Sequence, residues 1–105
     1  MLGPKRPAFN LNMRNSHLIK SSTDYLFKAI STPEYYLTSL SLKFCYPTFE
    51  QIVELSNGIR FNKSLVKLDL SSNGLKTPMV KYLLESLFDN VCLSELRLGS
   101  NFLED

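Results

Sequence analysis

Amide, thiol and imidazole side chains are the first candidates for chemistry in this sequence. Asn73 and Asn101 are separated by the same interval along the chain as Cys45 and Asn73. Either side-chain type would need an acid, a base or a metal beside it to take part in catalysis. The one histidine, His17, has no acidic residue or cysteine at a meaningful spacing, and we expect it in a solvated loop. The sequence therefore predicts no catalytic residue and no enzyme.

Composition and charge exclude several further classes of function. The 105-residue chain has 12 Lys and Arg against 10 Asp and Glu, a net charge of +2 that is too balanced to indicate binding to nucleic acid or to an anionic membrane surface. No apolar run approaches the roughly 18 residues that span a bilayer, and no apolar segment follows the basic N-terminus as in a secretory signal. A Gly-rich phosphate loop and a Cys/His metal cluster are also missing from the sequence, so we expect no cofactor and no metal. Two cysteines are too few for a disulfide framework, and Cys45 and Cys92 are expected to be reduced thiols of a cytoplasmic protein.

A repeated leucine pattern accounts for the spacing of the asparagines. The pattern Leu-x-x-Leu-x-Leu-x-x-Asn/Cys begins at Leu37, Leu65 and Leu93, so its three copies follow one another with a constant 28-residue period. A fixed period of this length indicates a solenoid, in which each repeat packs on its neighbours. A weaker copy, from Ala8 to Leu18, precedes the Leu37 copy, and alignment of the leucines requires a one-residue insertion between the two. Its departure from the pattern is typical of a terminal repeat.

Each repeat is predicted to contain one strand and one helix. The leucine patterns alternate apolar and polar residues, as a strand with one buried face does. Between them, apolar residues recur at helical spacing in three segments: Tyr25, Leu26, Phe27 and Ile30; Ile52, Val53, Leu55 and Ile59; and Met79, Val80, Leu83, Leu84, Leu87 and Phe88. We expect a residue of Ser21–Asp24 to cap the first helix, Thr48 and Gln51 to form a capping box on the second, and Thr77 to cap the third before Pro78.

These elements predict one α/β domain. It is a solenoid with about four parallel strands on the concave face and three helices on the convex face. Residues 1–7 form an N-terminal tail, and residues 8–105 form the repeat array, divided into a degenerate first repeat (8–36), repeats 37–64 and 65–92, and an incomplete last repeat (93–105). The third repeat has neighbours on both sides, so Leu68, Leu70, Leu83 and Leu87 are expected in the central core.

The 28-residue repeats resemble the ribonuclease-inhibitor-like subclass of leucine-rich repeat proteins, clearly over residues 37–105 and loosely over 8–36. The sequence departs from the subclass at Pro47, which replaces a leucine, and at Gln51 and Met79, which replace glycines. The resemblance implies a non-catalytic protein–protein interaction module that is part, or a truncated form, of a larger cytoplasmic scaffold. The subclass also includes Ran GTPase-activating proteins and ciliary and cytoskeletal proteins. Regulation of a small GTPase is therefore the alternative function, and cytoskeletal or ciliary association stays open.

Residues between the buried leucines of the strands are predicted to form the concave binding surface. The candidates are Ser41, Lys43, Lys67, Asp69, Ser71, Glu95 and Arg97. Because neighbouring strands lie about 4.8 Å apart, Lys67 is expected to pair with Glu95, and Asp69 with Arg97. Such pairs either form a charged docking surface or simply satisfy one another. Cys45, Asn73 and Asn101 are predicted to be structural, with side chains that bond backbone groups in the turn after each strand.

The last strand is predicted to have an open side. Leu96, Leu98, Phe102 and Leu103 would be covered by one neighbouring repeat only. We therefore expect a fragment or splice product of a longer array, or a chain whose open end a partner covers. We also expect the isolated chain to self-associate through this edge. Among the aromatic residues Tyr35, Tyr36, Phe44 and Tyr46, most are expected to pack in the core or in loops, and Tyr46 could be an exposed interface anchor.

Overall fold

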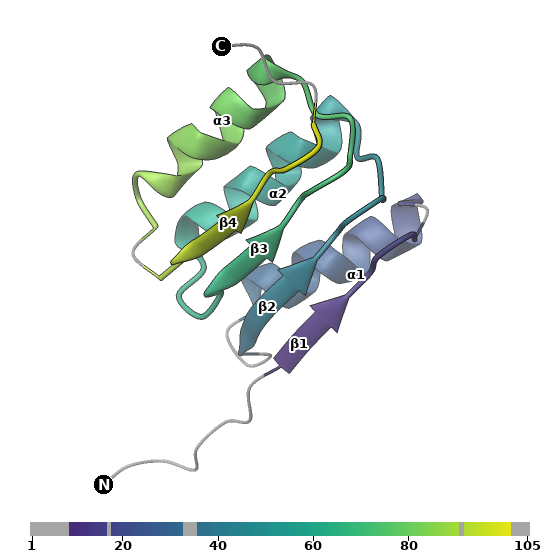
Figure 1. Cartoon of the computed structure of the whole chain (residues 1–105). Helices are drawn as coiled ribbons and strands as arrows, with labels where there is room; N and C mark the ends of the chain where they lie inside the picture. The colour runs from purple at the N-terminus through teal and green to yellow at the C-terminus, as the bar shows by residue number, and fades with distance from the viewer. Residues whose placement is uncertain (1–8, 17, 33–35, 91, 102–105) are drawn as a thin grey trace, which may run out of the picture.

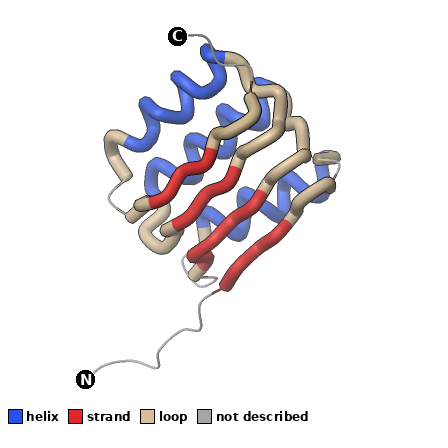
Figure 2. Tube along the Cα trace, viewed as in Figure 1, coloured by secondary structure: helices blue, strands red, loops and turns tan. Residues whose placement is uncertain are grey.

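Strands and helices alternate along the whole described part of the chain. The structure is a computed structural model that describes residues 9–16, 18–32, 36–90 and 92–101. The elements, in chain order, are β1 (Phe9–Asn12), α1 (Lys20–Ser31), β2 (Leu37–Ser41), α2 (Phe49–Phe61), β3 (Lys67–Asp69), α3 (Thr77–Leu87) and β4 (Glu95–Arg97). The strands form one parallel sheet in the order β1-β2-β3-β4, and the helices lie together on one side of it (Figures 1 and 2). The predicted α/β solenoid of four parallel strands and three helices is confirmed.

The repeat length sets the register of the sheet. Leu68 of β3 pairs with Leu40 of β2 and with Leu96 of β4, at the offset of the leucine pattern. Leu11 of β1 pairs with Leu40, as the alignment with a one-residue insertion predicted. The extra residue is accommodated by a register shift between Phe9 and Asn10. The weaker first copy therefore forms a true repeat in the same sheet.

The pattern leucines face the helices and form the core. Leu40, Leu68 and Leu70 are almost completely buried, and the helices contribute Leu26, Ile30, Ile52, Leu55, Ile59 and Leu83 to the same cluster. Of the four residues expected in the central core, Leu87 is only partly buried. Packed helices need about 8–10 Å between their axes, whereas neighbouring strands need about 4.8 Å. The strand side is consequently the inner side of the curve.

Helix starts follow the sequence prediction only at α2. There the hydroxyl of Thr48 accepts a hydrogen bond from the Gln51 amide at 3.2 Å, and the Gln51 side chain accepts one from the Thr48 amide at 2.8 Å. The predicted capping residues of α1 are wrong, because that helix already begins at Lys20, after Ile19. The prediction for α3 is also wrong by one residue, since the N-cap is Lys76. In α3 the fixed φ of the proline in the first turn favours helix initiation without a side-chain cap.

Two residues of the predicted apolar stripe on α3 are not in the core. Leu84 is 45% exposed and Phe88 is 88% exposed, whereas Ser86, which the apolar pattern omitted, is buried. The Ser86 hydroxyl donates to the carbonyl of Leu83 at 2.6 Å, so its burial leaves no polar group unsatisfied there. Val80 and Leu83 face the core. Leu84 and Phe88 thus lie on a flank of α3 that neither α2 nor the sheet covers.

Candidate functional site

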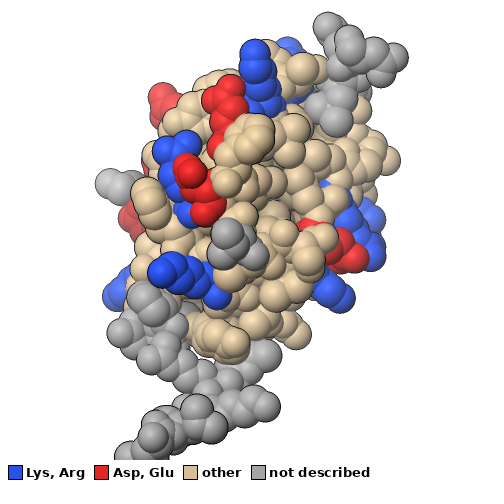
Figure 3. All heavy atoms as spheres, turned by 90° about the vertical axis from the view of Figure 1, so that its left-hand side faces the viewer, with Lys and Arg blue, Asp and Glu red and all other residues tan. Residues whose placement is uncertain are grey.

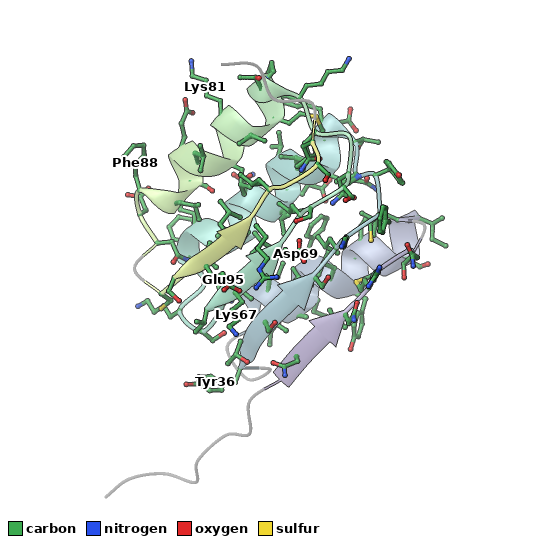
Figure 4. The ribbon with its side chains drawn as sticks, in the orientation of Figure 1. Tyr36, Lys67, Asp69, Lys81, Phe88 and Glu95 are labelled. Atoms are coloured by element: carbon green, nitrogen blue, oxygen red, sulfur yellow. The ribbon has the colours of Figure 1, made fainter. Side chains whose placement is uncertain are left out.

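The strand face opposite the helices carries the predicted binding residues in aligned rows. The register places Ser41, Asp69 and Arg97 in one row, and Lys67 beside Glu95 in the next. Figure 4 shows Lys67, Asp69 and Glu95 over the same face of the sheet. Lys43 and Ser71 lie just after the ends of β2 and β3. We call this set of seven residues the strand-face surface.

The first strand extends these rows with residues that the sequence analysis did not select. Asn10 pairs in register with Ser39, and Asn12 pairs with Ser41. The Asn10 side chain also accepts a hydrogen bond from the hydroxyl of Thr38 at 3.1 Å. The offset that aligns the weaker first copy with the second would have identified both asparagines. On the strands themselves this face is therefore uncharged along β1 and β2 and charged along β3 and β4, and Lys43 adds a positive charge just after the end of β2.

The charged residues of the surface are neighbours as predicted, but they do not form the predicted pairs. The Nε atom of Arg97 lies 3.5 Å from the Oε2 atom of Glu95, on its own strand. Within the described residues, no ion pair joins Lys67 to Glu95 or Asp69 to Arg97. Residues two apart on a strand share one face, and the long arginine side chain reaches Glu95 along it. An exposed pair of this kind contributes only about 0–1 kcal/mol to stability. A binding partner could therefore replace it at little cost, and both charges stay accessible to that partner.

Asp69 is held in its ionised form at the middle of the surface. Partial burial acts to raise the pKa of its carboxyl group, but hydrogen bonds from Ser71 and the positive charges of Lys43 and Arg97 outweigh that effect, and the pKa is lowered. One of the hydrogen bonds joins the Ser71 amide to Asp69 Oδ1 at 2.9 Å. Asp69 therefore presents a fixed negative charge among basic side chains at neutral pH.

Asn73 joins the turns of two neighbouring repeats. Its Oδ1 atom accepts hydrogen bonds from the amides of Cys45 at 2.7 Å and Tyr46 at 2.8 Å. Its Nδ2 group donates to the carbonyls of Leu42 at 3.0 Å and Leu70 at 2.9 Å. The side chain is almost fully buried, and all of its hydrogen-bonding capacity is used within the protein.

The same slot in the adjacent repeats is arranged in the same way. Asn101 Oδ1 accepts from the amide of Asn73 at 3.0 Å and from that of Leu75 at 2.9 Å. Cys45 occupies the slot one repeat before Asn73, and its thiol donates to the carbonyl of Met13 at 2.9 Å. Burial raises the pKa of the Cys45 thiol, which keeps the proton for this bond. These three side chains connect backbone to backbone and leave no reactive group exposed there.

A second asparagine ladder at the opposite end of the strands was not predicted. Asn62 donates to the carbonyl of Ile30 at 2.8 Å, and its Oδ1 atom accepts from the amides of Ser64 and Leu65. Asn90 repeats this pattern, donating to the carbonyl of Ile59 at 2.7 Å. The two asparagines lie 28 residues apart, so the spacing that revealed Asn73 and Asn101 would also have revealed them.

The turns after the strands hold two aromatic residues at the edge of the surface. Two cations lie over the ring of Phe44, with Lys43 Nζ 5.5 Å and the Arg14 guanidinium 5.7 Å from the ring centroid. Tyr46 is 64% exposed and has a left-handed backbone with φ of 51°. One repeat later the corresponding residue is Gly74, with φ of 67°. Tyr46 thus lies at the edge of the surface, where the next repeat uses glycine.

Some residues named in the sequence analysis lie outside the described residues, and the expected absence of a metal site and of a membrane span can be examined only within them. His17, Tyr35, Phe102 and Leu103 lie outside the described residues. In the described part, no group of three or more His, Cys, Asp or Glu residues could hold a metal ion. None of the helices described is long and apolar enough to cross a membrane.

Comparison with known proteins connects this architecture to a protein class. No model of a known family matches the chain. The chain is 33% identical over 94 residues to human NACHT, LRR and PYD domains-containing protein 13. The aligned stretch covers 90% of this chain and 9% of that protein. It is 36% identical over 92 residues to mouse ribonuclease inhibitor, covering 88% of this chain and 20% of the inhibitor.

A parallel sheet built from strand–helix repeats, with asparagine ladders between the turns, defines a leucine-rich repeat solenoid. The relatives agree with that class. The chain is a leucine-rich repeat protein of the ribonuclease-inhibitor-like subclass, as its repeat spacing predicted. It spans only 9% and 20% of the length of the two relatives.

Proposed function

We propose that the chain is a non-catalytic protein-interaction module and that its partner binds the strand-face surface. The observation that carries the proposal is the open face of the sheet, since all helices of the described part lie on the opposite side (Figure 1). The relationship to leucine-rich repeat proteins supports a scaffold role in protein interaction. One relative is by its name an inhibitor of ribonuclease, and therefore acts on another protein.

The charges of the surface indicate the chemistry of the partner. Lys67 is exposed and, within the described residues, has no ion-pair partner, while Asp69 is ionised and half-buried between basic side chains. A complementary partner would bring an acidic group to Lys67 and a basic group to Asp69. Such exposed charges affect specificity and association rate more than affinity. The uncharged rows over β1 and β2 would then add hydrogen bonds from amides and hydroxyls.

A charge reversal on the strand face tests this proposal. The doubly substituted chain Lys67→Glu/Asp69→Lys keeps the net charge, and a matched control, Lys81→Glu/Glu85→Lys, makes the same exchange on the exposed side of α3. Proteins bound to each immobilised chain in cell extract are quantified by mass spectrometry, after circular dichroism has verified folding. We expect the strand-face variant to lose specific partners that the wild type and the control retain. Equal binding by all three chains, or equal loss in both variants, would exclude the strand face as the binding surface.

We also propose that the chain is part of a larger cytoplasmic scaffold and that the isolated chain self-associates. Two apolar features support self-association: the exposed flank of α3 with Leu84 and Phe88, and the only partly buried Leu96 and Leu98 of the β4 repeat. Sedimentation should show dimers or larger species at micromolar concentration, and Leu84→Lys should reduce them. A monomer at all concentrations would contradict this proposal.

A further inference from the structure

A recess lies away from the strand face, where α1 and α2 end. Its volume is about 440 Å³, and it is lined by the last turns of both helices and by residues leading into β2 and β3. Recesses of about 300–1,000 Å³ are the usual size of sites for small molecules. This recess is independent of the strand-face surface, with which it shares no lining residue.

The walls of the recess are mainly apolar. Ile30, which is buried, contributes to the floor, and Tyr36 and Phe61 line the recess with exposed rings. Phe61 is 77% exposed and Tyr36 is 42% exposed. Figure 4 shows Tyr36 projecting from the ribbon at the start of β2. Two solvated aromatic rings beside a preformed hollow provide the apolar contact that an aromatic or branched ligand needs.

α1 and α2 pack closely against each other beneath the recess. Gly58 lies on α2 against α1, and a Cβ atom at this position would come within 3.0 Å of Ile30 Cγ2. Glycine therefore allows α2 to approach Ile30 directly. Asn62 also ties the ends of the two helices together by donating a hydrogen bond to the carbonyl of Ile30.

The electrostatics of the recess favour an acidic ligand group. Among the described lining residues, Lys63 is the one charged side chain. Helix C-termini carry a partial negative charge, but Lys28 in the last turn of α1 offsets it, and the asparagine side chains already occupy the carbonyls of Ile30 and Ile59. Figure 3 views the molecule from this end, and most of the described surface there is uncharged, with the charged side chains in separate small groups. The charge of Lys63 is therefore not matched by an acidic residue of the described lining.

We propose that this recess is a binding site for a small apolar molecule, aromatic or branched, that carries a single acidic group. The rings of Tyr36 and Phe61 contact the apolar body, and the ammonium group of Lys63 pairs with the acid. No such site follows from the strand-face function, and either proposal can fail without the other.

The first arm of the test separates the apolar contact from the charge. The full chain is titrated with 8-anilinonaphthalene-1-sulfonate, an aromatic anion, and with its uncharged analogue N-phenyl-1-naphthylamine, by fluorescence and by calorimetry. We expect saturable binding of one sulfonate per chain, tighter than binding of the neutral analogue. Lys63→Gln should weaken sulfonate binding about two- to fivefold, the range of one exposed ion pair. Lys81→Gln, an exposed lysine on α3 (Figure 4), should leave it unchanged.

The second arm locates the site. Phe61→Ala should weaken both probes at least tenfold, whereas Phe88→Ala, the matched exposed phenylalanine at the end of α3, should have no effect. Asn57→Trp provides a second test, because this exposed helix position lines the recess and a bulky ring there blocks it. Circular dichroism verifies the fold of each variant. Non-saturable binding, equal effects of the two phenylalanine substitutions, or undiminished binding by Asn57→Trp would overturn the site. If the chain binds both probes with equal affinity, and Lys63→Gln does not change that affinity, the proposal that the ligand carries an acidic group is refuted.

Discussion

Replacement of Asn73 by alanine is the sharpest test of how this solenoid is held together. The substitution removes four hydrogen bonds, two accepted from the amides of Cys45 and Tyr46 and two donated to the carbonyls of Leu42 and Leu70. A net hydrogen bond contributes about 0.5–1.5 kcal/mol, and a buried group left without any partner loses about 1–3 kcal/mol. The backbone conformation of both turns depends on this one side chain.

The magnitude depends on which backbone groups retain another partner. The Cys45 amide also donates to the Leu42 carbonyl at 3.2 Å, and the Leu70 carbonyl also accepts from Asn101 at 3.1 Å. The Tyr46 amide is near solvent. Four net bonds would contribute about 2–6 kcal/mol, and because several of these backbone groups retain another partner we expect the free energy of unfolding to fall by about 3 kcal/mol, in the lower half of that range. A domain of this size has roughly 5–15 kcal/mol in total, so the effect is large but measurable.

Urea denaturation followed by circular dichroism measures the loss, and Asn101 provides the matched control. Asn101→Ala removes equivalent bonds at a partly exposed site, where water can replace them, so we expect about 1 kcal/mol. Asn73→Asp keeps the acceptor but places a buried carboxylate oxygen against the carbonyls of Leu42 and Leu70, so it should destabilise the chain at least as much as alanine does. A loss below about 1 kcal/mol for Asn73→Ala, or an equal loss for both alanine variants, would refute the structural role assigned to this ladder.

Three further predictions address the core, the turn and the charged surface. Leu70→Ala should cost about 2–5 kcal/mol, because Leu70 is fully buried, and a circular dichroism melt within a few degrees of wild type would contradict the packing. Tyr46→Gly should stabilise the chain by up to about 1 kcal/mol, because glycine takes the left-handed φ of 51° without strain. A variant that melts at a lower temperature than the wild type would show that Tyr46 is not strained there. The pKa of Asp69 is lowered from 3.8, so its contribution is present above that pH and is lost as pH falls through the folded-state pKa. The urea stabilities of wild type and Asp69→Asn should differ near pH 7 and converge in acid, and a pH-independent difference would contradict the shift.

The sequence was sufficient to predict the sheet because one physical requirement recurs at one spacing. A leucine that faces the helices must recur once per repeat, and Leu40, Leu68 and Leu96 accordingly meet in register. Periodicity on a helix is less informative. It shows which residues form an apolar stripe, but not how much of that stripe the neighbouring helix and the sheet will bury. Leu84 and Phe88 extend the stripe of α3 beyond its covered part and are exposed.

The details of the candidate sites could be predicted only in part. The strand rows follow from the register, but the partner of Arg97 does not, since a long side chain can reach along its strand as well as across it. The recess between the helix ends could not be foreseen. It brings together Ile30, Tyr36 and Phe61 from three segments, and it depends on how closely Gly58 allows two helices to pack. Such convergence is set by tertiary packing and leaves no periodic signal.

Comparison of the repeats with one another separates structural from functional positions within this single chain. Where a side chain must satisfy backbone or fill the core, the same or a similar residue type tends to return after 28 residues, as with Asn73 and Asn101 or Asn62 and Asn90, although Cys45 fills the slot one repeat before Asn73. Where side chains face away from the helices, the type changes in every repeat, from Ser41 through Asp69 to Arg97 in a row of paired neighbours. The scaffold constrains the first kind of position and places no such demand on the second. The changing rows are therefore where this chain can differ from another leucine-rich repeat protein in what it binds.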